Sequence, residues 1–134
     1  MTRLAAIEGI GDVYAEKLRA AGIAAVEALL ERGATPRDRQ ALAEQTGVSL
    51  ALLLEWINRA DLFRVRGIGE EYSDLLESAG VDTVRELAQR NPENLYLKLA
   101  ETNQAKHLVR RLPGASHVGV WVAQAKRLPR AIEY

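Results

Sequence analysis

The chain has 134 residues, no cysteine and a formal net charge of zero. With 48% apolar and 27% charged residues, its composition is that of a globular protein and excludes extended disorder. The lack of cysteine excludes disulfide bonds and thiolate metal sites. The length suits one compact domain or two small units that share an interface.

The N-terminal residues predict no secretory signal, because Arg3 and Glu8 precede any long apolar run. No segment reaches the roughly 20 consecutive apolar residues that a membrane-spanning helix needs. We therefore expect a cytoplasmic protein that makes no contact with a membrane.

Positive charge is concentrated near the C-terminus. Residues 1–101 carry 12 Lys and Arg against 17 Asp and Glu, whereas residues 102–134 carry 6 against a single Glu. A neutral protein attracts a polyanion weakly at long range, so nucleic-acid binding would need this local patch. The patch consists of Lys106, Arg110, Arg111, Lys126, Arg127 and Arg130.

One segment recurs after 58 residues. The string IEGIG at residues 7–11 matches VRGIG at residues 65–69, and the match continues without a gap as far as Gly22 and Gly80. A second match aligns Trp56 with Trp121, and the second copy is longer around residues 110–116. This pattern indicates an internal duplication, with one unit at residues 1–61 and the other at residues 62–134.

Each copy predicts helices separated by turns. A short helix is expected to end at a Gly-Ile-Gly turn, because glycine tolerates positive φ and lets two helices approach closely. Helical patterns follow at residues 12–21 and 70–79, with Gly22 and Gly80 as C-terminal stops.

The remaining helices are marked by their N-caps. A third helix in each copy carries apolar residues at helical spacing, from Val26 and from Val84. Thr35-Pro36 and Asn91-Pro92 begin the fourth helix of each copy, and Ser49 and Ser116 are the expected caps of the last. The prediction is an all-α fold of two units with about five short helices each.

The order of these helices resembles the helix-hairpin-helix domains of DNA repair proteins and the C-terminal domain of the alpha subunit in RNA polymerase. The strings IEGIGDVYAEKLRAAGI, LLLEWINRADLFRVRGIGEEYSDLLESAGVDTVRELAQRNPENLYLKL and VRRLPGASHVGVWVAQAKRLP are also similar to a bacterial family of tandem helix-hairpin-helix proteins catalogued as a domain of unknown function. The resemblance covers nearly the whole chain, and it implies the fold and the possibility of DNA binding.

In helix-hairpin-helix domains that bind DNA, hairpin glycines let backbone N–H groups approach a phosphate, with help from a nearby Lys or Arg. Here the Gly-Ile-Gly turns supply that geometry twice, whereas Asp12, Glu70 and Glu71 at the following helix starts would repel a phosphate. The resemblance therefore implies DNA binding by the turn residues Gly9, Ile10, Gly11, Gly67, Ile68 and Gly69. The charge distribution adds the candidate phosphate contacts Lys17, Arg19, Arg66, Lys106, Arg110, Arg111, Lys126 and Arg130.

A structural interpretation stands beside this one. The glycines can serve only to let two helices pack at an angle. The basic residues can be ordinary surface positions, or they can dock one unit on the acidic surface of the other. On helices, Lys106 would share a face with Arg110, and Lys126 with Arg130, because each pair is four residues apart.

Other conspicuous side chains are expected to be structural. Tyr14, Tyr72, Trp56 and Trp121 have apolar neighbours and predict core positions, with the tyrosine hydroxyls hydrogen-bonded. The two histidines lack partners at metal-ligand spacing. No nucleophile elbow, Walker loop or zinc-protease motif is present, so we expect no enzyme activity, cofactor, metal or small-molecule substrate.

Two functional hypotheses follow. In the first, the protein binds DNA without sequence specificity through the hairpin amides and the basic patch. In the second, the hairpins are purely structural, and the helical faces dock a protein partner or a second copy.

Overall fold

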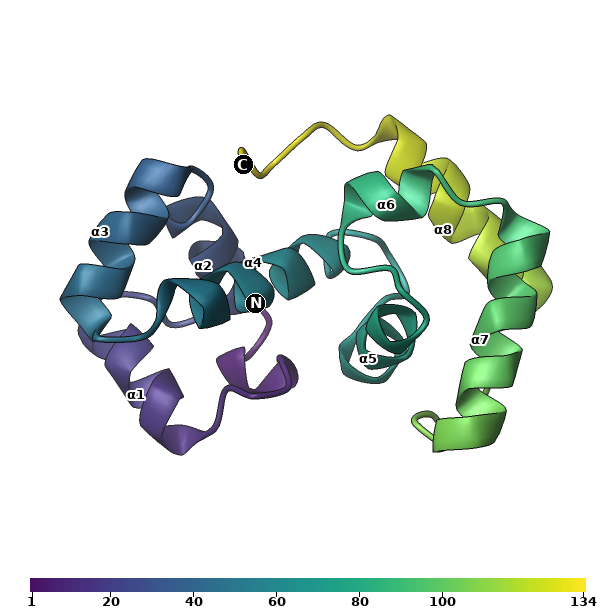
Figure 1. The fold of residues 1–134 in the computed structure, drawn as a ribbon, viewed down its shortest axis with the longest axis horizontal. Coiled ribbons are helices and arrows are strands. Elements are labelled where there is room, and N and C mark those ends of the chain that lie inside the picture. The colour runs from purple at the N-terminus through teal and green to yellow at the C-terminus, as the bar shows by residue number, and fades with distance from the viewer. The chain divides into compact units, whose positions relative to one another are not determined.

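The computed structural model describes all 134 residues and is entirely helical, which confirms the predicted all-α class (Figure 1). A short 3-10 helix and eight α-helices follow one another along the chain. They are η1 (Leu4–Ala6), α1 (Asp12–Ala20), α2 (Val26–Arg32), α3 (Pro36–Thr46), α4 (Leu50–Leu62), α5 (Glu70–Ser78), α6 (Val84–Ala88), α7 (Pro92–Lys106) and α8 (Ala115–Arg127).

The helices form two compact units. The first comprises Met1–Asp61 together with Arg130–Tyr134, and the second comprises Leu62–Pro129. The first unit holds η1, α1, α2, α3 and all of α4 except its last residue, Leu62. This agrees with the prediction of about five helices for each unit. The second has four helices of its own, α5 to α8, because α4 continues to Leu62 and its end replaces a separate opening helix.

Residues Arg130–Tyr134, here called the strap, were assigned from the sequence to the second unit but belong to the first. The N–H of Glu133 donates to the carbonyl of Ala34 at 2.7 Å, and its carbonyl accepts from the guanidinium of Arg39 at 2.7 Å. Ile132 is buried. These backbone contacts and one buried side chain leave no mark in the local sequence pattern, which explains the wrong assignment.

Most of the predicted helix ends are observed. The side chains of Thr35 and Asn91 accept hydrogen bonds from the first turns of α3 and α7, each followed by proline. Ser49 caps α4, with its hydroxyl accepting from the N–H of Leu52. Ser116 is not a cap, because α8 already begins at Ala115 after Gly114.

Helices α1 and α5 end in the same way. At the end of α1, the N–H of Gly22 donates to Arg19 and that of Ile23 to Leu18. Gly80 and Val81 repeat both hydrogen bonds at the end of α5, and both glycines have positive φ. This is the Schellman pattern, in which a left-handed glycine closes the helix.

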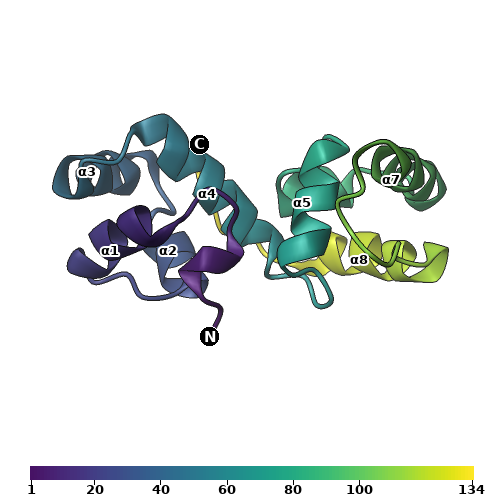
Figure 2. The same cartoon turned by 90° about the horizontal axis from the view of Figure 1, so that it is seen from below.

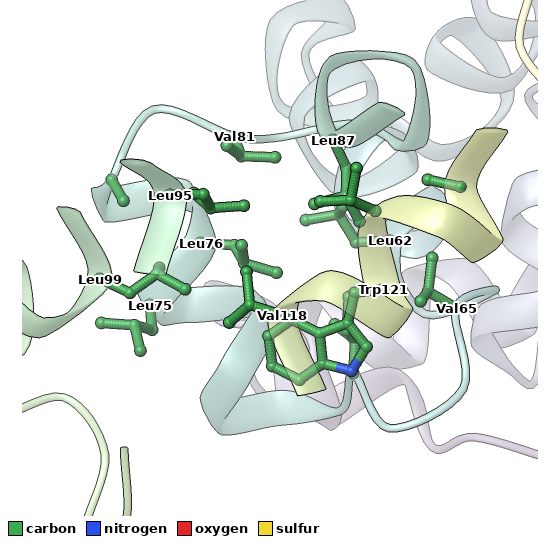
Figure 3. Packing of buried hydrophobic residues seen from close by; sticks show 14 of the residues in the cluster. Leu62, Val65, Leu75, Leu76, Val81, Leu87, Leu95, Leu99, Val118 and Trp121 are labelled. Atoms are coloured by element: carbon green, nitrogen blue, oxygen red, sulfur yellow. The ribbon is translucent and has the colours of Figure 1, made fainter. Parts of the chain in front are cut away.

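In the second unit α8 packs against α6 and α7, and α5 packs against α7 (Figures 1 and 2). A single apolar cluster fills the space between these helices, and Figure 3 shows the indole of Trp121 within it. Trp56 takes the corresponding place in the first unit with 1% of its surface exposed. The prediction that both tryptophans are core residues is confirmed.

Further contacts recur in the two units. Arg32 donates to the carbonyl of Ala21 at 3.0 Å, and its counterpart Arg90 donates at 3.1 Å to that of Gly80, one residue beyond the counterpart of Ala21. The ring of Tyr14 packs on Trp56 with centroids 5.0 Å apart, and the ring of Tyr72 packs on Trp121 at 5.3 Å. Contacts repeated in this way are what an internal duplication predicts.

The segment before the first Gly-Ile-Gly turn is fixed to α2. The carbonyl of Thr2 accepts from the N–H of Val26, and the Thr2 N–H donates to the carboxylate of Glu27 at 2.6 Å. Burial of Glu27 raises its pKa, but the hydrogen bonds from Thr2 outweigh this and leave the pKa below its usual value.

Candidate functional site

The two Gly-Ile-Gly turns, residues 9–11 and 67–69, lie at the starts of α1 and α5. The first glycine of each turn has positive φ, 98° at Gly9 and 92° at Gly67, which is a conformation that side chains rarely adopt. Ile10 and Ile68 point into the cores with 3% and 5% of their surface exposed. All four glycines are exposed.

The first glycine of each turn is required by the fold. A Cβ at Gly9 would lie 3.3 Å from the indole nitrogen of Trp56, and one at Gly67 would lie 3.0 Å from that of Trp121. Added to the positive φ, this close approach means that no other residue fits without strain. At Gly9 and Gly67 the structural interpretation is therefore sufficient.

The second glycine of each turn is different. Gly11 has a φ of −86° and Gly69 a φ of −117°, both ordinary for any residue. A Cβ at either position would meet no atom within 4 Å. Each is the N-cap of its helix, and no side chain caps the first-turn N–H groups of α1 or α5.

Charges at the helix starts partly oppose anion binding. Asp12 lies in the first turn of α1, and Glu70 and Glu71 lie in the first turn of α5, all exposed. The residue before the turn is Glu8 in the first unit and the exposed Arg66 in the second. The N–H of Arg66 donates to the side-chain oxygen of Gln124 on α8 at 2.9 Å.

The remaining predicted basic residues are exposed but do not form the expected helical stripe. Helix α7 ends at Lys106, so Arg110 lies in the loop that follows and not on the same helix face. Helix α8 ends at Arg127, so Arg130 likewise lies beyond it and belongs to the other unit. Both predicted four-residue pairs are wrong, because each helix stops before its second member.

The predicted basic residues of the first unit lie on α1. Lys17 and Arg19 fall in its last turn, away from the first Gly-Ile-Gly turn at its start. The ammonium of Lys17 lies 5.8 Å from the ring centroid of Tyr14. Lys17 is thus drawn to an aromatic face in its own helix.

Two residues of the second unit were missed as functional candidates. The hydroxyl of Tyr72, predicted only to be hydrogen-bonded in the core, donates to the carbonyl of Arg111 at 3.0 Å. The side chain of Asn103 donates to the carbonyl of Val109 and accepts from its N–H. Asn103 belongs to no sequence motif, so no sign of this contact is visible in the sequence alone.

The structure brings no three His, Asp or Glu residues together as a possible metal site. None of its helices has the length and apolar character needed to cross a bilayer.

These features define a class of all-helical protein in which each of two units presents an exposed Gly-Ile-Gly turn at a helix start. The family model described as Domain of unknown function (DUF4332) matches residues 8–128, and the chain belongs to this family. The match includes both turns and the whole of the second unit except its last residue, Pro129. No curated protein and no solved structure matched the chain.

Proposed function

We propose that this protein is a non-catalytic helix-hairpin-helix module that binds DNA through its phosphate backbone, without sequence specificity. The observation that carries the proposal is the second glycine of each turn. The φ angles at Gly11 and Gly69 would suit any residue, and a side chain would fit at both positions. The missing Cβ leaves room for a ligand to approach the backbone closely at these positions.

Backbone N–H groups at a helix start attract anions, because they are unpaired and lie at the positive end of the helix dipole. At three other helices of this chain such groups are capped by side chains, those of Thr35, Thr83 and Asn91, whereas α2 and α8 also begin without a side-chain cap. At α1 and α5 they stay uncovered. A phosphate oxygen would accept hydrogen bonds from these N–H groups. Contacts of this kind are made to the DNA backbone and do not depend on the base sequence.

The second candidate function is docking of a protein partner by the helical faces. The acidic helix starts favour it, as does Val13, which follows Asp12 on α1 with 70% of its surface exposed. An exposed valine beside the first turn is unfavourable in water and would gain from an apolar partner. Association of this kind would tolerate salt, whereas phosphate binding would not.

The test is a fluorescence-anisotropy titration with duplex, single-stranded and branched DNA of random sequence, from low to near-physiological salt. We expect binding whose log affinity falls by about 0.9 per log unit of salt for each phosphate contacted. Failure to bind any DNA at low salt would overturn the proposal and favour a protein partner.

A double variant, Gly11→Ser with Gly69→Ser, separates the two interpretations of the turns. Serine is a better N-cap than glycine by a few tenths of a kcal/mol, so stability should hold or rise slightly. Its hydroxyl would cover the amides, so DNA affinity should fall. A double variant that bound DNA as tightly as the parent would remove the turn amides from the proposed contact.

A further inference from the structure

The connection between the last two helices of the second unit is longer than its counterpart in the first. Residues 107–114, here called the arginine loop, join α7 to α8 and contain Arg110 and Arg111. In the first unit residues 47–49, which are uncharged, join α3 to α4. The arginine loop is therefore longer than the corresponding connection of the first unit, and it alone carries charged residues.

The arginine loop is held in place at several points. Asn103 pairs with both backbone groups of Val109, at 3.2 Å and 2.9 Å, and the side chain of Val109 is buried. Pro113 is buried as well. Arg110 and Arg111 are themselves exposed. The main chain is thus fixed while both guanidinium side chains reach solvent, which lowers the entropy lost when they bind a ligand.

The hydrogen bond from Tyr72 joins the arginine loop to the first turn of α5, which follows the second Gly-Ile-Gly turn. Tyr72 is the third residue of α5, and its hydroxyl donates to the carbonyl of Arg111. The start of α5 is also where Gly69 leaves the first-turn amides uncovered. Arg66 precedes that turn and is tied by its backbone to α8. Three arginines from two segments therefore border one end of α5.

The first unit lacks this arrangement. Glu8 occupies the position of Arg66, and the three-residue connection between α3 and α4 has no counterpart of Arg110 and Arg111. Over all their residues, the second unit carries ten Lys and Arg against eight Asp and Glu, a net +2. The first carries eight against ten, a net −2.

We propose that the second unit alone makes the phosphate contacts, with Arg66, Arg110 and Arg111 binding neighbouring phosphates of one DNA strand. This inference rests on the proposed function and assigns it to one half of the chain. A guanidinium group suits the task because it donates two parallel hydrogen bonds to a phosphate and keeps its charge at any physiological pH. The first unit has the same uncovered amides at Gly11, but Glu8 in place of Arg66 and an uncharged connection in place of the arginine loop leave them without the positive charge that attracts a phosphate.

The experiment compares two variants of the full chain that each lose two positive charges. Arg110→Gln/Arg111→Gln removes them from the arginine loop, and Lys17→Gln/Arg19→Gln removes them from the exposed surface of α1. Affinity is measured by anisotropy on a duplex of about 20 base pairs, over a salt range from about 50 mM to about 300 mM.

We expect Arg110→Gln/Arg111→Gln to weaken binding at least about tenfold at low salt and to reduce the salt slope by about 1.8, the value for two lost phosphate contacts. Lys17→Gln/Arg19→Gln should change affinity by less than about twofold, because this inference assigns no phosphate contact to the first unit. The single variant Gly69→Ser should also weaken binding, because its hydroxyl would cover the first-turn amides of α5.

Equal losses in both double variants, or a larger loss from the α1 pair, would overturn this inference while leaving DNA binding intact. No binding by the parent protein at low salt would overturn the proposed function, and the inference with it. Thermal unfolding of each variant, expected to match the parent, shows that a loss of affinity is not a loss of fold.

Discussion

The indole nitrogen of Trp56 lies 3.3 Å from the position that a Cβ on Gly9 would occupy, and its N–H has no hydrogen-bond partner. The first Gly-Ile-Gly turn therefore rests directly on a buried tryptophan whose polar atom is left unsatisfied. An unpaired buried donor costs free energy, which the packing of the large ring must offset. The position of the turn is therefore determined by its contact with the core of the first unit.

Gly9→Ala should consequently destabilise the protein by about 1–3 kcal/mol, because it combines a positive φ with a close approach to Trp56. Gly67→Ala should act alike through Trp121. Urea denaturation followed by circular dichroism measures both. The matched controls are Gly11→Ser and Gly69→Ser, which should shift stability by less than about 0.5 kcal/mol. A control as damaging as its partner variant would show that the second glycine is structural too.

The helical fold could be predicted because its signals are local. Glycine stops at Gly22 and Gly80 and the caps Thr35 and Asn91 act within a single turn of chain, and each was observed where expected. The spacing of apolar residues also placed Trp56 and Trp121 in the cores. Such features need no knowledge of tertiary structure.

The candidate site was less predictable, because its geometry depends on distant contacts. The basic residues were assigned to helix faces, but α7 stops at His107, a residue with positive φ, and the side chain of Asn103 holds the next segment in a loop. The strap was misassigned for the same reason, since its partners lie more than 70 residues away along the chain. Pairings of this kind leave no periodic pattern.

The strap should contribute much of the stability of the first unit. Ile132 is 3% exposed, so Ile132→Ala should cost about 2–5 kcal/mol through lost burial and an unfilled cavity. Glu133 uses only its backbone in the two contacts with Ala34 and Arg39. Glu133→Gln is therefore the control and should be nearly neutral in the same denaturation experiment. Nearly neutral behaviour of Ile132→Ala would mean that the strap is dispensable.

The hydrogen bond between Tyr72 and Arg111 should matter for binding more than for folding. Tyr72→Phe keeps the ring on Trp121 and removes only the hydroxyl, so we expect a stability loss of about 1 kcal/mol. Freed from this contact, the arginine loop should bind DNA several-fold more weakly. The salt slope should not change, because no charge is lost.

Tyr14→Phe is the control for this experiment, since the hydroxyl of Tyr14 makes no such bond and its ring also packs on a tryptophan. It should leave both stability and DNA affinity nearly unchanged. Equal effects of the two substitutions on affinity would argue against a positioning role for Tyr72. A changed salt slope in Tyr72→Phe would indicate that the loop had lost a phosphate contact outright.

Glu70 and Glu71 provide a prediction of the opposite sign. Both are exposed in the first turn of α5, where they interact favourably with the helix dipole and occupy the region in which a phosphate would bind. Glu70→Gln/Glu71→Gln should therefore lower the stability of the protein, by about 0.3–1 kcal/mol for each charge removed, and raise its DNA affinity several-fold at low salt. Asp12→Asn in the first unit should have the same effect on stability and none on affinity. If Asp12→Asn strengthened binding as much as the Glu70/Glu71 pair, both turns would be in contact with DNA, and the assignment of the phosphate contacts to the second unit would be wrong.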